Sequence, residues 1–468
     1  MPGSSRNLRT RVGVAISSSK MRVESPSHKP APANIERKGI SEPMRILILG
    51  INYYPEHTSV SPFTTGLSEH LAAQGHSVKV ITAFPYYPDW RTWDGYRGRI
   101  TQKEYLNGVH IRRVLHFIPW KPSRLIERLL HDFSFAVAAF VGGLVEGKCD
   151  VIYCSSPPPA VSLAAYALSR LKRVPYTIKL TDLASEAALA TGILRPGTLV
   201  GLARKLEGFL YRNAEAVFCL CGAFIDSLRA RGIAATRLHR IPDWGDTENI
   251  QPRPGDSSFR AANNISPDQF LLLHTGNMGK KQDLVNLVRA AELTRHDEQL
   301  VWVIVGEGED RELVESEIQA RELGNVRLLP LQPREALCRM YADADALLLN
   351  QKASVKDAVI PSKLLTYMSS GRPVIASVDT GSEAAREIRR ANCGLIVAPE
   401  DPAALVEGVA SVRTDSVLRA WRGANGRAHA EAYFTKASVL GAYDRYFESR
   451  FATQPTEGLL PGGSATAD

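Results

Sequence analysis

The chain has 468 residues, enough for about two or three domains of ordinary size. Its hydrophobic content of 44% and charged content of 23% are those of a globular protein and exclude a wholly disordered or fibrous chain. The formal net charge is +8, but residues 1–43 hold eight Lys and Arg against three Glu, so +5 lies there and +3 on the rest. The basic excess is local, and we expect no nucleic-acid partner.

From residue 44 the chain reads as alternating strands and helices. Short continuous apolar runs, typical of buried parallel strands, occur in two series. The first series lies at 45–49, 78–82, 151–154, 176–180 and 214–220, and the second at 270–274, 301–305, 326–329, 346–349 and 374–376. Helical segments fill the gaps, and one is predicted to have Ser61 as its N-cap and Pro62 as its first residue. Two such series predict an α/β fold with two doubly wound, Rossmann-like domains that face a cleft.

The domain boundaries follow from composition. Pro, Gly, Asp and Asn are concentrated over 242–266, which indicates a linker between domains. We predict a disordered basic leader at 1–43, an N-terminal Rossmann-like domain at 44–245, a C-terminal Rossmann-like domain at 246–450 and a loose tail at 451–468. The leader lacks the uninterrupted apolar segment of a secretory signal, and an over-long gene model is the alternative interpretation.

Residues 120–145 combine cations with apolar side chains. Lys121, Arg124 and Arg128 stand beside Trp and Leu residues, and the longest apolar run of the chain, 133–145, follows them. That run is shorter than the roughly 20 residues that span a bilayer. The composition is typical of a helix lying in a membrane interface. A buried helix with a basic end is the alternative.

Motifs for bound cofactors and metals are absent from the sequence. No predicted strand is followed by GxGxxG, no GxxxxGK[ST] occurs, and there is no HExxH. The six cysteines form no CxxC pair and have no framework spacing, which indicates reduced thiols of a cytosolic protein. We therefore expect no metal and no cofactor, and place the protein in the cytoplasm.

Three loops at the ends of predicted strands carry groups that suit a nucleoside diphosphate. In the first, Gly276 and Gly279 allow close approach of the backbone, and Lys280 or Lys281 adds positive charge at a helix start. The second, 305–309, is predicted to be a tight turn that borders the nucleotide. The third is a helix start at 361–363, where a lysine in the first turn suits phosphate or ribose.

The order of these motifs resembles the nucleotide-sugar domain of retaining glycosyltransferases of the GT-B fold, family 4. The segments GNMGKKQ at 276–282, VGEG at 305–308 and PSKLLTYMSSGRPVIAS at 361–377 carry the resemblance. In the first half, NYYPE, AAQGHSV, AFPYYPDW and IPDW, which begin at 52, 72, 83 and 241, are similar to the colanic acid and exopolysaccharide biosynthesis subgroup. The resemblance spans residues 44–451.

The resemblance implies transfer of a sugar from a nucleotide-sugar to a hydroxyl group, with retention at the anomeric carbon. The residues that it assigns to the donor diphosphate are Lys281, Lys280, Gly276, Asn277 and Gly279. Those that it assigns to the nucleotide and ribose are Gly306, Glu307, Ser362, Lys363 and Thr366. In the predicted donor domain the chain departs from the family at three positions: Asn277 stands where an arginine occurs, and Ala358 and Thr366 stand where two glutamates occur. In the first half, Ala184 and Ser185 replace a Trp-Pro pair of the family.

The first half is expected to supply the acceptor side. Asp182 follows the predicted strand 176–180 and matches an Asp-Leu-Trp-Pro-Glu segment of the family, which implies that it orients the acceptor hydroxyl or stabilises the cationic sugar. The alternative is a helix N-cap, and Glu186 is predicted to be a first-turn helix residue. Loop aromatics that suit stacking on the acceptor, with core packing as the alternative, are Tyr53, Tyr86, Tyr87 and Trp90.

The expected function is a hexosyl- or deoxyhexosyl-transferase of exopolysaccharide biosynthesis. Its expected partners are a nucleotide-sugar donor, a polyprenyl-linked or saccharide acceptor, and the inner face of the cytoplasmic membrane, where it would be peripheral. Two alternatives stay open. One is a non-hydrolysing nucleotide-sugar epimerase, against which the aromatic-rich loop at 83–93 speaks. The other is a non-catalytic nucleotide-sugar-binding homologue, which the three departures from the family favour.

Overall fold

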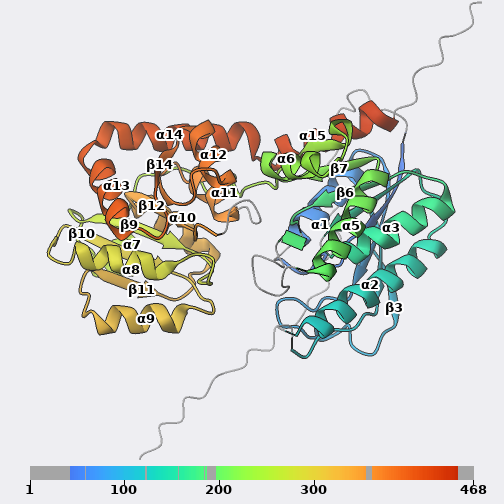
Figure 1. Ribbon diagram of the computed structural model, residues 1–468, viewed down its shortest axis with the longest axis horizontal. Helices are drawn as coiled ribbons and strands as arrows, with labels where there is room; N and C mark the ends of the chain where they lie inside the picture. The colour runs from blue at the N-terminus through green and yellow to red at the C-terminus, as the bar shows by residue number, and fades with distance from the viewer. Residues whose placement is uncertain are drawn as a thin grey trace, which may run out of the picture. The chain divides into compact units, whose positions relative to one another are not determined.

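The computed structural model describes residues 43–451, except 58–59, 122–123, 157, 184, 187–196 and 355–360. The predictions for the leader and the tail therefore lie outside the described residues, apart from Pro43 and Phe451. Two sheets organise the described part of the chain (Figure 1). The predicted α/β fold with two doubly wound domains is confirmed.

The first sheet has the strand order β3-β4-β2-β1-β5-β6-β7-β8. All neighbours are parallel except β3 and β4, which pair antiparallel. Its strands are β1 (Arg45–Leu49), β2 (Ser77–Ala83), β3 (Thr101–Leu106), β4 (Val109–Val114), β5 (Val151–Ser156), β6 (Tyr176–Leu180), β7 (Ala216–Cys219) and β8 (Leu238–Arg240). The helices between them are α1 (Ser61–Ala73), α2 (Leu125–Val145), α3 (Pro159–Lys172), α5 (Thr198–Asn213) and α6 (Gly222–Ala230), with a 3-10 turn at Ala235–Arg237.

The second sheet is entirely parallel, with the order β11-β10-β9-β12-β13-β14. Its strands are β9 (Phe270–Thr275), β10 (Leu300–Val305), β11 (Val326–Leu329), β12 (Ala346–Asn350), β13 (Val374–Ser377) and β14 (Gly394–Val397). The helices are α7 (Ser258–Ala262), α8 (Leu284–Leu293), α9 (Arg311–Ala320), α10 (Arg334–Asp343), α11 (Ser362–Ser369), α12 (Glu383–Ala391), α13 (Pro402–Thr414), α14 (Ser416–Tyr433) and α15 (Lys436–Phe451).

Each sheet is apolar on both faces because helices cover both. In β1, Ile46 and Ile48 belong to one core cluster, whereas Leu47 and Leu49 belong to the cluster on the opposite face. Successive side chains of a strand point to opposite faces, so a strand covered twice must be continuously apolar. This is the reason that the short apolar runs of the sequence located the central strands correctly.

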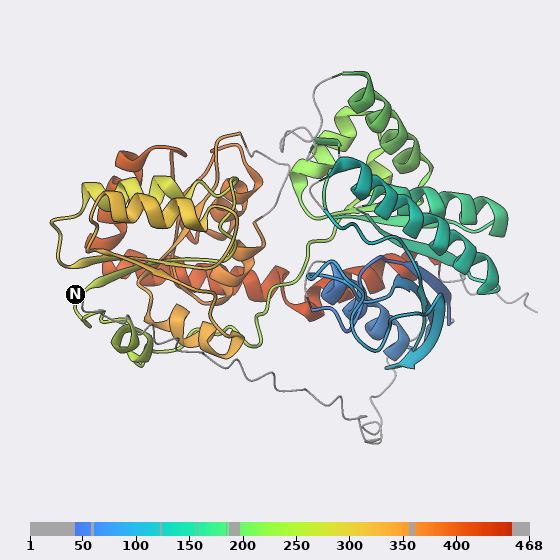
Figure 2. The same ribbon diagram turned by 90° about the horizontal axis from the view of Figure 1, so that it is seen from below.

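The last helix corrects the predicted domain boundary. Side chains of α15, including Tyr443 and Phe447, belong to the same core cluster as Ile48 of β1 and Phe218 of β7. Figures 1 and 2 show α15, in red, beside the blue and green elements of the first sheet. The prediction that 246–450 form the C-terminal domain is therefore wrong for α15, which completes the N-terminal domain instead.

Smaller predictions also changed. Ser61 is not the N-cap of α1: it is the first helical residue, Val60 precedes it, and the Ser61 hydroxyl donates to the carbonyl oxygen of Glu56 at 2.6 Å. The sequence analysis missed the β3–β4 hairpin, although Asn107-Gly108 occupies its two-residue turn with φ of 49° and 83°. An Asn-Gly pair between strands is the usual signal for such a turn.

Candidate functional site

The loop after β9 and the loop after β10 are joined at the carboxyl edge of the second sheet. Gly276 N donates to Val305 O at 2.9 Å, and Met278 N donates to Glu307 O at 2.8 Å. A Cβ added to Gly306 would lie 1.9 Å from the carbonyl oxygen of Gly276, so a side chain there would force the loops apart. Glu307 contributes its backbone to this contact, while its exposed carboxylate lies 3.6 Å from Arg311.

The two lysines of the first loop differ in their surroundings. Lys280 is exposed, and its ammonium forms an ion pair with Glu309 at 2.7 Å. It therefore already has a partner other than the phosphates of a nucleotide-sugar. Lys281 is partly buried, and its carbonyl oxygen accepts from Lys352 N at 3.0 Å. Asn277 is exposed, and Gly279 N donates to Gln282 Oε1 at 3.1 Å. Of this group, Lys281 has the better setting for a donor phosphate.

Helix α11 brings a third lysine to the same loop. Lys363 Nζ lies 3.2 Å from His274 Nε2, and a Cβ added to Gly276 would lie 3.7 Å from that Nζ. Burial lowers the pKa of Lys363 to about 8. Ser362 beside it is exposed and Thr366 is partly buried. Lys363 and Gly276, assigned from the sequence to the ribose and to the diphosphate respectively, thus lie beside each other, whereas Ala358 lies outside the described residues.

Sequence reasoning missed the buried groups that hold this loop. His274 is completely buried, and Tyr367 Oη accepts from Thr275 N at 3.0 Å. Tyr341 Oη and Thr275 Oγ1 lie 2.9 Å apart. A histidine inside an apolar strand and a tyrosine one helical turn after Lys363 were the available signals. Neither is distinctive without knowledge of which helix covers which strand.

Asp182 lies two residues beyond the end of β6, and its charge interacts with that of Lys281. Burial raises the pKa of Asp182 to about 6, Lys281 opposes this shift, and Asp243 adds to it. The alternative of an N-cap has no support, because Ser185 N donates to Glu207 Oε1 at 2.9 Å instead. Glu186 pairs with Arg231, as befits a structural residue. The Asp182 carboxyl of the first half and Lys281 of the second half therefore lie close enough for the lysine charge to affect the pKa of the carboxyl.

The segment that ends with Asp243 is held against β6. Lys179 Nζ lies 3.2 Å from Asp243 Oδ1 and donates to Ile241 O at 2.7 Å. Lys179 is only 4% exposed, so this pairing supplies the partner that a buried ammonium requires. Asp182 follows the same strand, and the charge of Asp243 acts on its carboxyl.

Glu56 organises the loop after β1 and was missed by the sequence analysis. Its carboxylate accepts from Asn52 Nδ2 and from the backbone N–H groups of Tyr86 and Tyr87, each at 2.8 Å. Burial raises the pKa of Glu56, and these hydrogen bonds counteract the shift. A 3% exposed carboxylate with three donors connects the loops after β1 and β2. In the sequence these loops are visible only as the segment NYYPE at 52–56 and the pair Tyr86-Tyr87, and neither indicates that the two loops are in contact.

The predicted acceptor aromatics divide into two pairs. Tyr53 is 2% exposed with its hydroxyl 2.7 Å from Ser68 Oγ, and Tyr86 is 3% exposed with its hydroxyl 3.1 Å from His131 Nε2. Both rings pack in the core, so the prediction that they stack on a sugar is wrong. Tyr87 and Trp90 are partly buried, and the Arg128 guanidinium lies 5.2 Å from the centre of the Trp90 ring.

Helix α2 is apolar on its outer face as well as on its inner face. Exposed side chains recur along one stripe, namely Ile126, Leu129, Phe133, Val137, Val141 and Val145, each at least 54% exposed. On the inner side, a Cβ added to Gly143 would lie 2.4 Å from Leu168 Cδ1, so the glycine permits close packing on α3. Among the described residues this is the one helix long and apolar enough to cross a membrane, which by itself is weak evidence.

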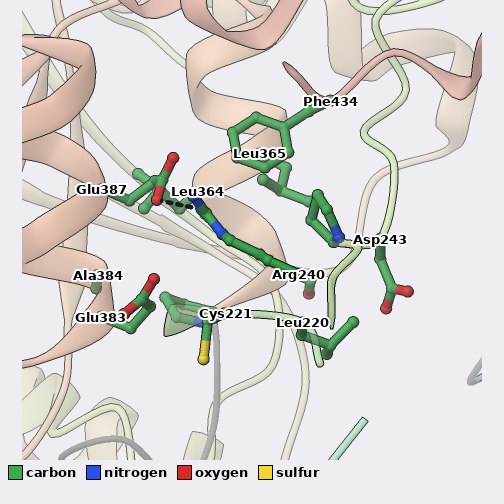
Figure 3. A pocket seen from close by; sticks show the side chains of 13 residues that line it. Leu220, Cys221, Arg240, Asp243, Leu364, Leu365, Glu383, Ala384, Glu387 and Phe434 are labelled. Carbon is green, nitrogen blue, oxygen red and sulfur yellow. Dashed lines mark hydrogen bonds and ion pairs between the residues drawn. The ribbon is translucent and has the colours of Figure 1, made fainter. Parts of the chain in front are cut away.

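A pocket is lined by residues from both halves of the chain, including Arg240, Asp243, Ser362 and Glu387. Figure 3 shows Arg240 reaching Glu387, with 2.8 Å between Nη2 and Oε2. Glu387 Oε1 also lies 2.7 Å from His429 Nε2. Glu383 accepts from the N–H groups of Gly222 and Ala223 at the start of α6, each at 3.3 Å.

Family models of glycosyltransferases match both halves of the chain. The profile described as "Glycosyl transferase 4-like domain" matches residues 59–244, and that of "Glycosyl transferases group 1" matches 256–429. The chain is 30% identical over 406 residues to WcaI of Escherichia coli strain K12, named as a colanic acid biosynthesis glycosyl transferase, with 85% of this chain and 98% of that protein covered. It is 24% identical to the alpha-D-kanosaminyltransferase of Streptomyces kanamyceticus, over 60% of this chain and 70% of that protein.

Solved structures share the fold. Sucrose-phosphate synthase from Thermosynechococcus elongatus superposes with a TM-score of 0.67 at 17% identity, covering 87% of this chain and 99% of that one. Anabaena HepE in complex with UDP gives a TM-score of 0.64 at 15% identity, covering 87% of this chain and 100% of that one. With two parallel sheets, both family profiles and a relative matched over nearly its whole length, the chain belongs to the GT-B glycosyltransferases of family 4 and is an enzyme of glycoconjugate or polysaccharide biosynthesis.

Proposed function

We propose that the enzyme transfers a sugar from a nucleoside-diphosphate sugar to a lipid-linked or saccharide hydroxyl in exopolysaccharide assembly, with retention at the anomeric carbon. The observation that carries the proposal is that Asp182, just beyond β6, and Lys281, in the loop after β9, lie near enough for the charge of Lys281 to act on the Asp182 carboxyl. Departure of the diphosphate leaves negative charge on the leaving group and positive charge on the sugar. Lys281 is suited to the first charge and Asp182 to the second.

The donor class has further support from a relative of known structure. HepE was solved with UDP, with UDP and glucose, and with UDP-glucose. In this chain the loop after β9 contributes the partly buried Lys281, a cation of the kind that a diphosphate needs. The proposal assigns charge stabilisation to lysines and requires no metal, so EDTA should leave the transfer rate unchanged.

The proposed acceptor is polyprenyl-linked and lies at the inner face of the cytoplasmic membrane. Support comes from α2, whose exposed apolar stripe begins beside Arg124 and Arg128. Apolar side chains flanked by cations suit the boundary between acyl chains and anionic headgroups, where each cation contributes about 1 kcal/mol. Peripheral attachment would bring the enzyme to a substrate that cannot leave the bilayer.

The test is transfer of radiolabelled sugar into membrane lipid. Purified protein is incubated with bacterial membranes and a panel of UDP-, GDP- and dTDP-sugars, and the lipid extract is counted. Wild-type protein should label lipid with at least one donor, and Lys281→Ala should abolish labelling while keeping the far-UV circular dichroism. Lys205→Ala, which changes an exposed lysine on α5, is the matched control and should behave as wild type.

The same assay separates the two alternatives. An epimerase would convert a donor into its epimer without membranes, which chromatography of the nucleotide-sugar pool detects. A non-catalytic homologue would bind a donor without turnover across the whole panel. Either result would contradict the proposed transfer.

A further inference from the structure

Lys363 is a partly buried cation that forms no ion pair with a carboxylate among the residues that the structure describes. Among the described residues its ammonium has a hydrogen bond with the His274 ring alone, and no nearby acid raises its pKa, which burial lowers to about 8. Holding an unpaired charge away from water costs free energy, so such a group normally serves a ligand of opposite charge. Lys281 and Lys280, by contrast, act on Asp182 and Glu309.

The His274 ring fixes the direction of this ammonium. Its Nδ1 lies 3.0 Å from the carbonyl oxygen of Leu348, which can only accept a hydrogen bond, so Nδ1 carries the proton. Burial, followed by the charge of Lys363, lowers the pKa of His274 well below its ordinary value, so the ring stays neutral. Nε2 therefore has a free lone pair and accepts one of the three ammonium protons of Lys363.

Hydrogen bonds connect the three elements that surround Lys363. Tyr367 lies one turn after Lys363 on α11, accepts from Thr275 N at 3.0 Å and donates to Leu348 O at 3.3 Å. The same carbonyl oxygen accepts from His274, so β9, β12 and α11 meet at one point. Lys363 Nζ is consequently held beside Gly276, whose φ of +112° leaves the loop open to close approach.

The start of α11 also contributes hydrogen-bond donors near Lys363. Pro361 precedes the helix, and no side chain caps it. Among the described residues, no side chain accepts from the N–H groups of Ser362 and Lys363 or from the two remaining ammonium protons of Lys363. A group with several anionic oxygens satisfies both sets at once.

We propose that Lys363 binds the diphosphate of the donor and supplies the second cation that the family's arginine, replaced here by Asn277, would provide, with His274 as its positioning residue. The inference rests on the proposed donor class. It assigns the diphosphate, and not the ribose, to Lys363, because the Lys363 ammonium lies beside Gly276 of the loop after β9 and a diphosphate carries the negative charge that this cation lacks as a partner.

The test is calorimetric titration with UDP, GDP and dTDP and with their monophosphates. For the nucleotide that wild type binds, Lys363→Met should raise the Kd of the diphosphate about 10- to 100-fold, the effect of losing one buried charged hydrogen bond. The Kd of the monophosphate should rise less. Lys363→Gln serves as a second variant should the methionine protein fail to fold, and Lys205→Met is the control for loss of an exposed lysine.

His274 is tested through its coupling to Lys363. His274→Phe should weaken diphosphate binding to a similar extent, and His274→Gln, which keeps an acceptor near the position of Nε2, should restore it to within about 3-fold of wild type. The double variant His274→Phe with Lys363→Met should bind no more weakly than Lys363→Met alone, because His274 acts only through that lysine. Additive losses, or equal losses in the Phe and Gln variants, would show that His274 has a purely structural role.

The outcomes also separate this inference from the proposed function. If wild-type protein binds none of the diphosphates, the proposed donor class itself is wrong. If wild type binds one and Lys281→Ala weakens it, but Lys363→Met does not, the donor class stands and the assignment of Lys363 is wrong.

Discussion

At the scale of single residues, the candidate site contains two groups, Asp182 and Lys363, whose charged forms are disfavoured by burial. Asp182 has its pKa raised to about 6, and that of Lys363 is lowered to about 8, in both cases chiefly by burial. Each group is less stable in its charged form than it would be in water. A bound diphosphate and a developing oxocarbenium ion are the partners that would favour those charged forms.

Asp182→Asn should separate stability from activity. The folded-state pKa of about 6 lies above the ordinary 3.8, so the carboxyl stabilises the fold below about pH 4 and this contribution is lost as the pH rises through 6. As the pH rises from 4 to 7, the unfolding free energy of the Asn variant should therefore increase relative to that of wild type by at most about 3 kcal/mol, and its melting temperature should rise accordingly. Its kcat should fall roughly 100-fold or more, with little change in donor Kd.

A melting curve at each pH and a steady-state assay check both halves of this prediction. An equal effect of the substitution on melting temperature at pH 4 and pH 7 would show that Asp182 is not titrating in this range.

Gly306→Ala should damage the donor loop. The added Cβ would lie 1.9 Å from Gly276 O, and the backbone φ of +155° disfavours a side chain. We expect a loss of roughly 1–3 kcal/mol in unfolding free energy and weaker diphosphate binding. Gly201→Ala on α5, where an added Cβ meets nothing within 4 Å, is the control and should be neutral or slightly stabilising. Denaturant titration and calorimetry measure the two quantities.

At the scale of elements, the sequence predicted the strands that form continuous apolar runs and the helix starts that neighbouring residues mark. The central strands were found because both faces of each sheet are covered, and the helix starts at Ser61 and Ser362 were found to within one residue. The β3–β4 hairpin was missed because its strands lie at the edge and alternate exposed with buried side chains. The site was predicted as far as loops and lysines, whereas His274, Tyr367 and Glu56 act through contacts between distant segments.

The apolar stripe of α2 predicts membrane binding that is separate from folding. Replacing Leu129 and Val137 together by Asp should abolish co-flotation with phosphatidylglycerol vesicles, because both side chains are more than half exposed and make no core contact. The unfolding free energy should change by less than about 0.5 kcal/mol for each substitution. Val417→Asp, at a 79% exposed position on α14, is the matched control.

Flotation of the double variant at the wild-type level would exclude α2 as the membrane contact. A detergent-solubilised acceptor should restore transfer by this variant, since its donor site is unchanged.

At the scale of the whole molecule, the two sheets are not independent units. Helix α15 closes the face of the first sheet formed by β1, β2, β5 and β7, although it follows every element of the second sheet along the chain. Phe447→Ala should therefore lower the unfolding free energy by about 3–5 kcal/mol, as for a large side chain removed from a core. Tyr433→Ala, at a 60% exposed position, should change it little.

Chemical denaturation followed by circular dichroism measures both variants. An undiminished unfolding free energy for Phe447→Ala would show that α15 contributes no packing to the first sheet.

The position of α15 also sets an order of events during synthesis. The ribosome makes the first sheet early, but the side chains that cover one of its faces, including Tyr443 and Phe447, are made last. Domains generally fold in the order in which they emerge. Here the nascent N-terminal domain must wait, with an apolar face exposed, until the second domain has been translated, and this interval is when a chaperone would be needed most.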